Sequence, residues 1–322
     1  MSVGRKILKD VSRSFYLSIR VLPRAMREPI SLGYLLARAS DTLADTADLD
    51  PSLRANLLDG FSDILKGAES ASWVERVQNE VVPHQTHDGE RVLLENISGV
   101  IDWFHSLAGQ EAPANTEHYE AVSGIQKSIG VRLHAAILTV MEHILRGQRL
   151  DIERFELRDD FRFTLDAELE EYCYLVAGCV GEFWTDVGEI SLGKFSRIES
   201  SRLHRWGANY GKGLQLINIL RDVPNDLKNG RCYLPGVDTS DKTVMMAEAA
   251  RWRARARSYL EEGHDYACSL SCRRAKAATA LPGLIGERTL DLLDVADWQQ
   301  LERGIKVPRS EVYRCVWEAL IV

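Results

Sequence analysis

The chain has 322 residues, of which 45% are apolar and 27% charged, and its formal net charge is −7 at pH 7. This composition is typical of a soluble globular protein, and the excess of negative charge argues against broad nucleic-acid binding, so no nucleic-acid partner is expected. No linker rich in Pro, Gly or Ser and no repeat of fixed period divides the sequence. We therefore predict a single domain over residues 1–322.

Helical periodicity dominates the sequence, and alternating runs of β-branched residues are scarce, so the predicted fold class is all-α. Proline, glycine and polar clusters mark the helix ends. No uninterrupted apolar stretch approaches the ~20 residues of a membrane span, so no integral membrane segment is expected. The predicted breaks lie near Pro23, Pro29, 48–51, Gly67, 83–89, 109–115, 147–151, 188–193, 229–241, 282–286 and 304–308.

The first polar feature is SRSF, in which Ser12, Arg13 and Phe15 belong to a small basic patch on an amphipathic helix. A planar guanidinium is well suited to phosphate, so Arg13 is a candidate diphosphate contact. Ordinary surface charge is the alternative interpretation of this patch.

A stronger pattern is present in SLGYLLARASDTLADT. Its polar residues recur at i, i+4, i+7 and i+11, which places them on one face of a helix whose remaining residues are apolar. Carboxylates on such a helix need a counter-charge, and oxygen donors without His or Cys favour Mg²⁺ over Zn²⁺. Further on, Asp50 precedes Pro51 and is predicted to cap a turn or helix rather than to bind metal. The residues of the polar face are Tyr34, Arg38, Asp41 and Asp45.

The segment from Leu169 to Trp184 combines an apolar stripe with small residues. Tyr172, Val176, Cys179 and Phe183 recur along one face and could line a tunnel, although a core stripe is the alternative. Ala177, Gly178 and Gly181 are poor helix formers, so we expect them to permit close helix approach or to leave space for a long ligand.

A second acidic helix is predicted within GKGLQLINILRDVPNDLKNGRCYLP. Amide and carboxylate side chains again share one face, with Arg221 beside them and Arg231 in the loop after the helix. Because Pro224 lacks a backbone N–H and disfavours helix at Val223, we expect the helix to end or kink between the two acids. Two facing acidic helices with arginines alongside suggest a diphosphate held by metal ions. The polar face comprises Gln215, Asn218, Asp222 and Asp226.

These motifs closely resemble those of the squalene and phytoene synthases, and the resemblance runs over most of the chain. It rests on SRSF, YLLARASDTLAD, YCYLVAGCVG, QLINILRDVPND and NGRCYLP, in the order and at the spacing of the family. Within the family, the segment YCYLVAGCVGEFWTDV resembles bacterial squalene synthases more than it resembles phytoene synthases. The resemblance implies a helical isoprenoid-synthase bundle with a central apolar cavity, in which two prenyl diphosphates are joined through their first carbons.

By the same resemblance, farnesyl diphosphate is the expected substrate, Mg²⁺ the expected metal and NADPH the expected reductant, with presqualene diphosphate as intermediate and squalene as product. No GxGxxG follows a strand, so the NADPH residues are not assigned. One alternative is a dehydrosqualene or phytoene synthase, which does not reduce its product. Another is a non-catalytic relative that acts in complex assembly. Such relatives typically lose the acidic motifs, and both motifs are intact here. The expected metal ligands are Asp41, Asp45, Asp222 and Asp226; the expected catalytic residues are Tyr172, Asn218 and Arg221; and the expected substrate contacts are Ser12, Arg13, Phe15, Tyr34, Arg38, Val176, Gln215, Asn218, Arg221 and Arg231.

The six cysteines lie within predicted helices or motifs without a secretory leader, which favours reduced thiols and a cytoplasmic location. Two segments have a peripheral membrane contact as one of their interpretations. The arginines of RWRARARSYLEEGHDY could meet anionic lipid, although a structural role is the simpler interpretation. The final VYRCVWEALIV is interpreted as a core helix, with a membrane-surface contact as the alternative. The oligomeric state is not predicted.

Overall fold

The protein is represented by a computed structural model that describes residues 7–8, 10–11, 15–109, 117–158 and 161–321, with side chains omitted at 15 and 117–127. All regular elements in these ranges are helical, apart from an isolated bridge between Ser196 and Leu270. The all-α prediction is therefore confirmed. The chain divides into two compact units, each of which draws on separate stretches of sequence, and the single-domain assignment stays a prediction.

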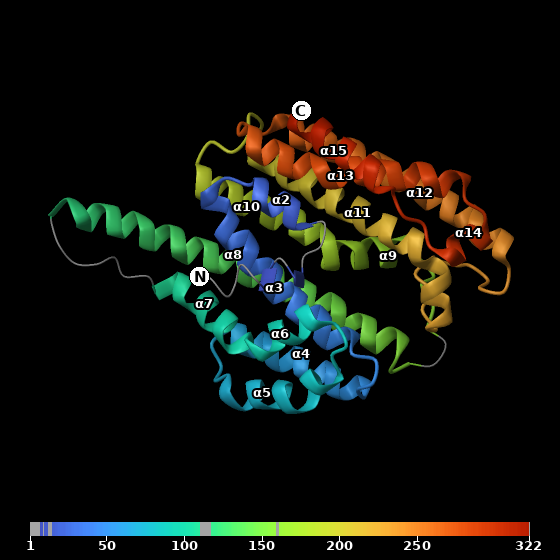
Figure 1. The fold of residues 1–322 in the computed structure, drawn as a ribbon, viewed down its shortest axis with the longest axis horizontal. Helices are drawn as coiled ribbons and strands as arrows, with labels where there is room; N and C mark the ends of the chain where they lie inside the picture. The colour runs from blue at the N-terminus through green and yellow to red at the C-terminus, as the bar shows by residue number, and fades with distance from the viewer. Residues whose placement is uncertain (1–6, 9, 12–14, 110–116, 159–160, 322) are drawn as a thin grey trace. The chain divides into compact units, whose positions relative to one another are not determined.

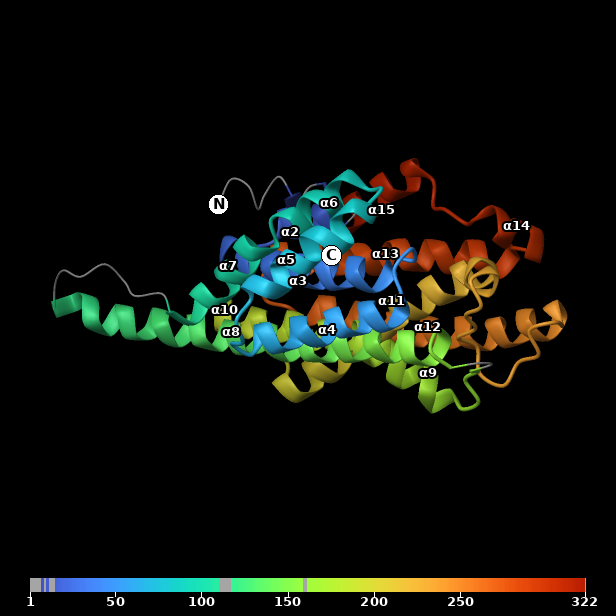
Figure 2. The ribbon, with the colours of Figure 1, turned by 90° about the horizontal axis from the view of Figure 1, so that it is seen from below.

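Unit 1 comprises residues 1–19, 24–157 and 186–193. Its centre is α3 (Arg24–Asp45), whose fully buried residues include Leu32, Leu35 and Leu43. Helix α3 packs against α4 (Pro51–Leu65), α6 (Asp88–Glu95), α7 (Ile97–Gly109) and α8 (Glu117–Phe155), and α4 and α8 also lie side by side (Figure 2). The connection from α4 to α6 contains α5 (Ala71–Arg76), the π-helical η1 (Val77–Val81) and the 3₁₀ turn η2 (Val82–His84).

Unit 2 comprises residues 20–23, 158–185 and 194–322. The long helices α11 (Ser200–Lys228), α12 (Lys242–Ser269) and α13 (Arg273–Val295) pack on one another, and α15 (Arg309–Ile321) packs on α13 (Figure 1). The unit also contains α9 (Asp166–Cys173), the π-helical η3 (Tyr174–Gly178) and α14 (Trp298–Arg303). Two further helices, α2 (Phe15–Val21) and α10 (Cys179–Leu192), contain residues of both units.

Several predicted helix ends are confirmed, among them the cap at Asp50. The Asp50 carboxylate accepts hydrogen bonds from the backbone N–H groups of Ser52 at 2.8 Å and Leu53 at 3.3 Å, while Pro51 fills the first helical turn. Four other predicted breaks are wrong, because helices continue through Pro29, residues 147–151, Pro224 and residues 282–286. Local propensity is overridden at these positions by the packing of long helices.

Helix α11 continues through Pro224, so the expectation that it ends between the two acids is wrong, whereas a kink at this position stays a prediction. Val223 and Pro224 are both buried, as is Leu220 one turn earlier. Proline costs the helix one hydrogen bond at the carbonyl of Leu220, and the burial of these apolar side chains offsets that loss. Asp222 and Asp226 therefore lie on the same continuous helix.

Close backbone contact explains the small residues of η3 and α10. A Cβ on Gly181 would lie 1.9 Å from the carbonyl oxygen of Gly207, and a Cβ on Gly211 would lie 2.2 Å from that of Ala177. Of the two expectations for these residues, close helix approach is what the structure has. The contact holds η3 and the first turn of α10 against α11.

Two helices, α8 and α12, bear on the expectations about membrane contact. Within α8, Ser128–Phe155 is long and apolar enough to cross a membrane by length and composition alone, and 33% of its most apolar window is buried. Core helices of soluble proteins meet the same criterion, so localisation stays a prediction. On α12, Arg251, Arg253, Arg255 and Arg257 all form ion pairs with carboxylates of unit 2, which accounts for the basic pattern without lipid.

Helix α15 is a core helix on one face only. Cys315 and Ala319 are buried against α13, whereas Tyr313, Trp317 and Ile321 are exposed. The core interpretation therefore holds for one side of the helix, and a membrane-surface role for the other side stays a prediction. All six cysteines are free thiols, as predicted.

Candidate active site

The first acidic motif lies on the C-terminal half of α3. Its polar face is partly exposed, while the other residues of this half of the helix are mostly buried, as the spacing predicts. The Arg38 guanidinium donates to a carboxylate oxygen of Asp41 at 2.7 Å, and these side chains are 31% and 44% exposed. Asp45 lies one turn further on and is exposed. The motif thus presents two carboxylates, and that of Asp41 is paired with Arg38.

A chain of hydrogen bonds orients Arg38. Its Nη2 donates to the Tyr34 hydroxyl at 3.3 Å, and that hydroxyl donates to the backbone carbonyl of Val11 at 3.0 Å. The guanidinium also lies 5.9 Å from the centroid of the Tyr34 ring. Among the described residues, the buried Nε of Arg38 has no hydrogen-bond partner, so this donor is left unsatisfied. Tyr34 therefore positions the arginine, a role that spacing alone did not suggest.

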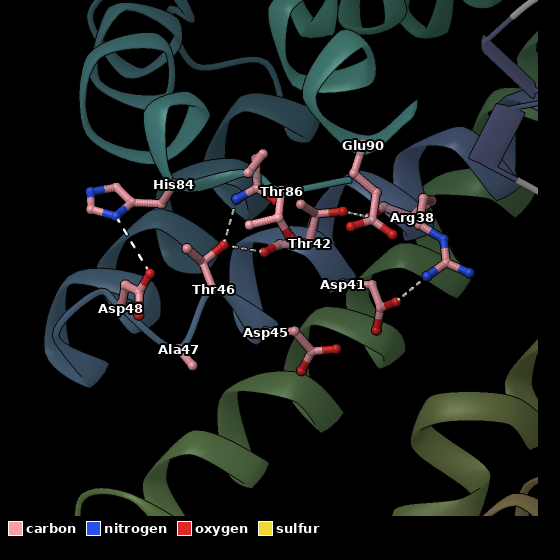
Figure 3. A pocket seen from close by; sticks show the side chains of 11 residues that line it. Arg38, Asp41, Thr42, Asp45, Thr46, Ala47, Asp48, His84, Thr86 and Glu90 are labelled. Carbon is pink, nitrogen blue, oxygen red and sulfur yellow. Dashed lines mark hydrogen bonds and ion pairs between the residues drawn. The ribbon is translucent and has the colours of Figure 1, made fainter. Parts of the chain in front are cut away.

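A polar cavity of about 260 Å³ adjoins this motif (Figure 3). The segment before α6 forms its other wall and is tied to α3 by Gln85, whose amide donates to the Thr46 hydroxyl at 2.8 Å. Thr46 in turn donates to the carbonyl of Thr42 at 2.7 Å. The lining residues are Arg38, Asp41, Thr42, Asp45, Thr46, Ala47, Asp48, His84, Gln85, Thr86 and Glu90.

Electrostatics at the cavity favour the arrival of a cation. The pKa of Asp41 is raised to about 7, chiefly by desolvation, with Asp45 and Glu90 also raising it and Arg38 lowering it. Repulsion among neighbouring carboxylates is relieved either by a proton or by a metal ion. Glu90, which comes from α6 and carried no sequence motif, is thus a member of the cluster that the sequence did not reveal.

The second acidic motif lies near the C-terminal end of α11. Arg221 donates two hydrogen bonds to the Asp222 carboxylate, from Nε to Oδ1 at 2.9 Å and from Nη2 to Oδ2 at 2.6 Å. The pKa of Arg221 is raised chiefly by its hydrogen bond to Asp222, with a smaller contribution from Asp226. Both paired side chains are partly exposed, so they remain accessible to a ligand.

The end of α11 places Arg231 beside this motif. Gly230 adopts a φ of 76°, which favours glycine, and its N–H bonds to the carbonyl of Leu227 at 3.0 Å. The N–H of Arg231 then bonds to the carbonyl of Asp226 at 2.8 Å. This pattern is a Schellman cap, in which the residue after glycine folds back over the last helical turn. Arg231 is therefore held by its backbone at Asp226, as its predicted role requires.

The amides predicted beside the second motif lie on the same face of α11. Asn218 is exposed and its amide donates weakly to the Gln215 carbonyl oxygen at 3.4 Å, whereas Leu216, Ile217 and Ile219 on other faces are buried. The polar stripe is therefore as predicted, and roles for Asn218 and Gln215 at the reacting carbons stay predictions.

Tyr172 lies in an aromatic cluster of unit 2. Its ring stacks on Tyr233 at a centroid distance of 4.9 Å and lies 6.3 Å from Phe163, and both tyrosines are almost wholly buried. Tyr233 belongs to the NGRCYLP segment, where sequence reasoning assigned it no role. Val176 is half-buried within η3, whose π-helical turn interrupts the regular spacing of the predicted stripe.

Three predicted contacts are not placed. Ser12 and Arg13 lie outside the described residues, and the side chain of Phe15 in α2 is likewise not described. No residue is assigned to NADPH.

The residues of each motif fit Mg²⁺. Mg²⁺ usually binds through one or two carboxylates and completes its shell with water and substrate phosphates, and each motif offers two carboxylates beside an arginine. In the described ranges, no group of three or more His, Cys, Asp or Glu could hold a metal ion by itself. The donor set therefore suits a metal that arrives together with an oxygen-rich anion.

An all-α chain with two acidic, arginine-bearing helices has the architecture of an isoprenoid synthase. The particular family is shown by the sequence, because the squalene/phytoene synthase profile matches residues 8–311. The chain belongs to this family. A squalene synthase of Eremothecium gossypii is 27% identical over 71% of this chain and 45% of its own length, and phytoene synthase 3 of Zea mays is 29% identical over 52% and 40%. The chain thus spans less than half the length of these curated relatives.

Solved structures show the same fold. A complex titled TcSQS with the ligand E5700 has a TM-score of 0.70 at 19% identity, covering 98% of this chain and 85% of that one. A dehydrosqualene synthase has a TM-score of 0.61 at 21% identity, covering 99% and 94%. The squalene synthase HpnC of Alicyclobacillus acidocaldarius has a TM-score of 0.59 at 18% identity, covering 91% and 92%. At these identities, the likeness establishes the fold.

Proposed function

We propose that this protein is a Mg²⁺-dependent squalene synthase, which joins two farnesyl diphosphates through presqualene diphosphate and reduces the product to squalene with NADPH. The observation that carries the proposal is the pair of acidic motifs, each with an arginine bonded to its first carboxylate, in a member of the squalene/phytoene synthase family. Asp41 and Asp45 in unit 1 and Asp222 and Asp226 in unit 2 are the proposed Mg²⁺ ligands.

The chemistry is governed by charge. A diphosphate leaves an allylic carbon only when its charge is neutralised, and bound Mg²⁺ supplies that Lewis-acid stabilisation. Arg38 and Arg221 donate to the diphosphate oxygens, and their charge stabilises the departing anion. Arg231 lies at Asp226 and can add a third guanidinium. Tyr34 keeps Arg38 oriented toward its motif through the two hydrogen bonds described above.

The carbocation left behind must be kept from water and close to the second prenyl chain, which is a role for an apolar helical cavity. The central apolar cavity itself stays a prediction. Aromatic faces stabilise positive charge, and Tyr172, held by its stack on Tyr233, is the proposed aromatic contact. Val176, Gln215 and Asn218 are proposed contacts of the prenyl chain and the reacting carbons.

A non-reducing product is the second candidate, because a dehydrosqualene synthase and a phytoene synthase are among the proteins that this chain resembles. The deciding experiment incubates purified protein with farnesyl diphosphate and Mg²⁺, with and without NADPH, and identifies the products by gas chromatography and mass spectrometry. We expect presqualene diphosphate or unreduced by-products without NADPH and squalene with it. A hydrocarbon profile indifferent to NADPH would favour the non-reducing enzyme.

A cytoplasmic location with peripheral membrane contact completes the proposal, since farnesyl diphosphate is soluble and squalene is a membrane lipid. The exposed Tyr313, Trp317 and Ile321 of α15 are compatible with such a contact, because aromatic side chains favour the interface between lipid and water. Sedimentation of the protein with liposomes tests this part, and a protein that stays in the supernatant with both neutral and anionic liposomes would contradict it.

A further inference from the structure

Both acidic motifs contain the same kind of ion pair, although their arginines stand at different positions. Arg38 precedes Asp41 by three residues, whereas Arg221 is the immediate neighbour of Asp222. Side chains at adjacent helix positions do not face each other, so the second pair forms only because the long arginine side chain turns back toward the carboxylate. In each case, the first acid of the motif holds the arginine.

The paired oxygens are the atoms that a divalent cation would need. Arg221 donates to both carboxylate oxygens of Asp222, so a cation that binds either oxygen there competes with the guanidinium for the negative charge of that oxygen. Arg38 engages Oδ2 of Asp41. All four side chains are between 31% and 44% exposed, so the pairs can open without moving the helices.

The balance of charge determines whether such an exchange is favourable. Two aspartates and one arginine give the second motif a net charge of −1, and a divalent cation changes it to +1 while the displaced guanidinium remains nearby. In the first motif, Glu90 adds a negative charge, so the same cation changes the charge from −2 to 0. In both motifs the displaced guanidinium loses its carboxylate partner, which is unfavourable unless an anion accepts it. Diphosphate is such an anion, and its oxygens match the planar donor geometry of arginine. The Nε of Arg38 also has no partner within the described part of the chain, and a phosphate oxygen could accept from it once the side chain has moved.

We propose that Arg38 and Arg221 are exchange residues, each of which holds the first carboxylate of its motif and transfers to diphosphate when a divalent cation takes that carboxylate. This inference rests on the proposed function and deepens it. Its consequence is positive cooperativity, in which cation and diphosphate each strengthen the binding of the other by the same factor. The two arginines thereby weaken the binding of metal in the absence of substrate.

The first test measures Mn²⁺ alone, as a spectroscopic substitute for Mg²⁺, by electron paramagnetic resonance of the free ion. The variants are Arg221→Lys and Arg221→Gln, and Arg257→Gln is the control because Arg257 on α12 also pairs with carboxylates and is similarly exposed. If the pair must open, both Arg221 variants bind Mn²⁺ about fivefold more tightly than the wild type, since a partly exposed pair contributes up to about this factor. The control stays at the wild-type value.

Arg221→Lys separates exchange from general charge, because lysine keeps the positive charge but cannot grip both oxygens of Asp222. A lysine variant that binds Mn²⁺ like the wild type would overturn the exchange. Arg38→Lys, with Arg149→Gln as its control, repeats the test in unit 1, where Arg149 pairs with Asp59.

The second test measures radiolabelled inorganic diphosphate by equilibrium dialysis at several fixed concentrations of free Mn²⁺. In the wild type, Mn²⁺ should tighten diphosphate binding more than tenfold, and in Arg221→Gln this gain should fall several-fold. An equal gain in both proteins would overturn the exchange while leaving the proposed function intact. A wild type that binds no Mn²⁺ with or without diphosphate would overturn both, because the metal sites themselves would then be wrong.

Discussion

The close contact between Gly181 and Gly207 predicts that adding a single methyl group at Gly181 strongly destabilises the protein. In Gly181→Ala, the new Cβ would lie 1.9 Å from the Gly207 carbonyl oxygen. Real Cβ atoms essentially never lie closer than 3.0 Å to a heavy atom of this kind. The obstacle is backbone, so no side chain can turn away, and α10 must move from α11 by roughly 1 Å. A gap of that size forfeits about a quarter to a half of the van der Waals attraction across the contact.

We therefore expect Gly181→Ala to lower the free energy of unfolding by about 3 kcal/mol, the upper end of the usual cost of overpacking. The assay is urea unfolding followed by circular dichroism, in which the midpoint should fall with little change of slope. Gly99→Ala is the matched control, since Gly99 lies in α7 with no atom within 4 Å of its added Cβ. That substitution should stabilise by about 0.5–1 kcal/mol. Equal midpoints for the two variants would refute the backbone-contact argument.

Three further predictions concern the metal motifs, an acid-sensitive network and the aromatic cluster. Asp41→Asn and Asp222→Asn should each lower the consumption of farnesyl diphosphate by about 10²-fold or more at unchanged circular dichroism, and EDTA should have the same effect until Mg²⁺ is restored; near-normal turnover in a variant or in EDTA would remove the metal assignment. Glu170 is partly buried, which raises its pKa, but hydrogen bonds from Lys212 and Tyr259 outweigh this, so its pKa lies below 4.5. The contribution of Glu170 to stability is therefore present above its unfolded-state pKa and is lost as the pH falls through the lower folded-state pKa. In Glu170→Gln, the free energy of unfolding measured in urea should fall less steeply between pH 6 and 3 than in the wild type. An unchanged dependence on pH would contradict this. Tyr233→Leu should release Tyr172 and lower kcat more than it raises KM, whereas a variant with wild-type kcat would show that the stack has no catalytic consequence.

Periodicity was sufficient to predict the faces of the two acidic helices. Tyr34, Arg38, Asp41 and Asp45 share one side of α3 because helical geometry fixes directions along a single element. The cap at Asp50 was predictable for the same reason, since its partners are two and three residues away.

The features that escaped prediction depend on distant residues or on side-chain conformation. The helix rule failed at Pro224 because the burial of Val223 and Pro224 outweighs a missing hydrogen bond, and burial depends on the whole of unit 2. The stack of Tyr172 on Tyr233 joins α9 to the segment after α11, which no local spacing encodes. Glu90 entered the first cluster from a separate helix with no motif of its own.

The division of the chain into units has a consequence for its synthesis on the ribosome. Residues 20–23 belong to unit 2, and the carbonyl of Val21 accepts a hydrogen bond from Arg274 at 2.8 Å, 253 positions later. At roughly 5–20 residues per second, Val21 waits more than about ten seconds for this partner. Unit 1 likewise lacks residues 186–193 until most of the chain has been made. Neither unit can be completed by the first half of the nascent chain, so truncated products should be substrates for chaperones and proteases rather than stable fragments.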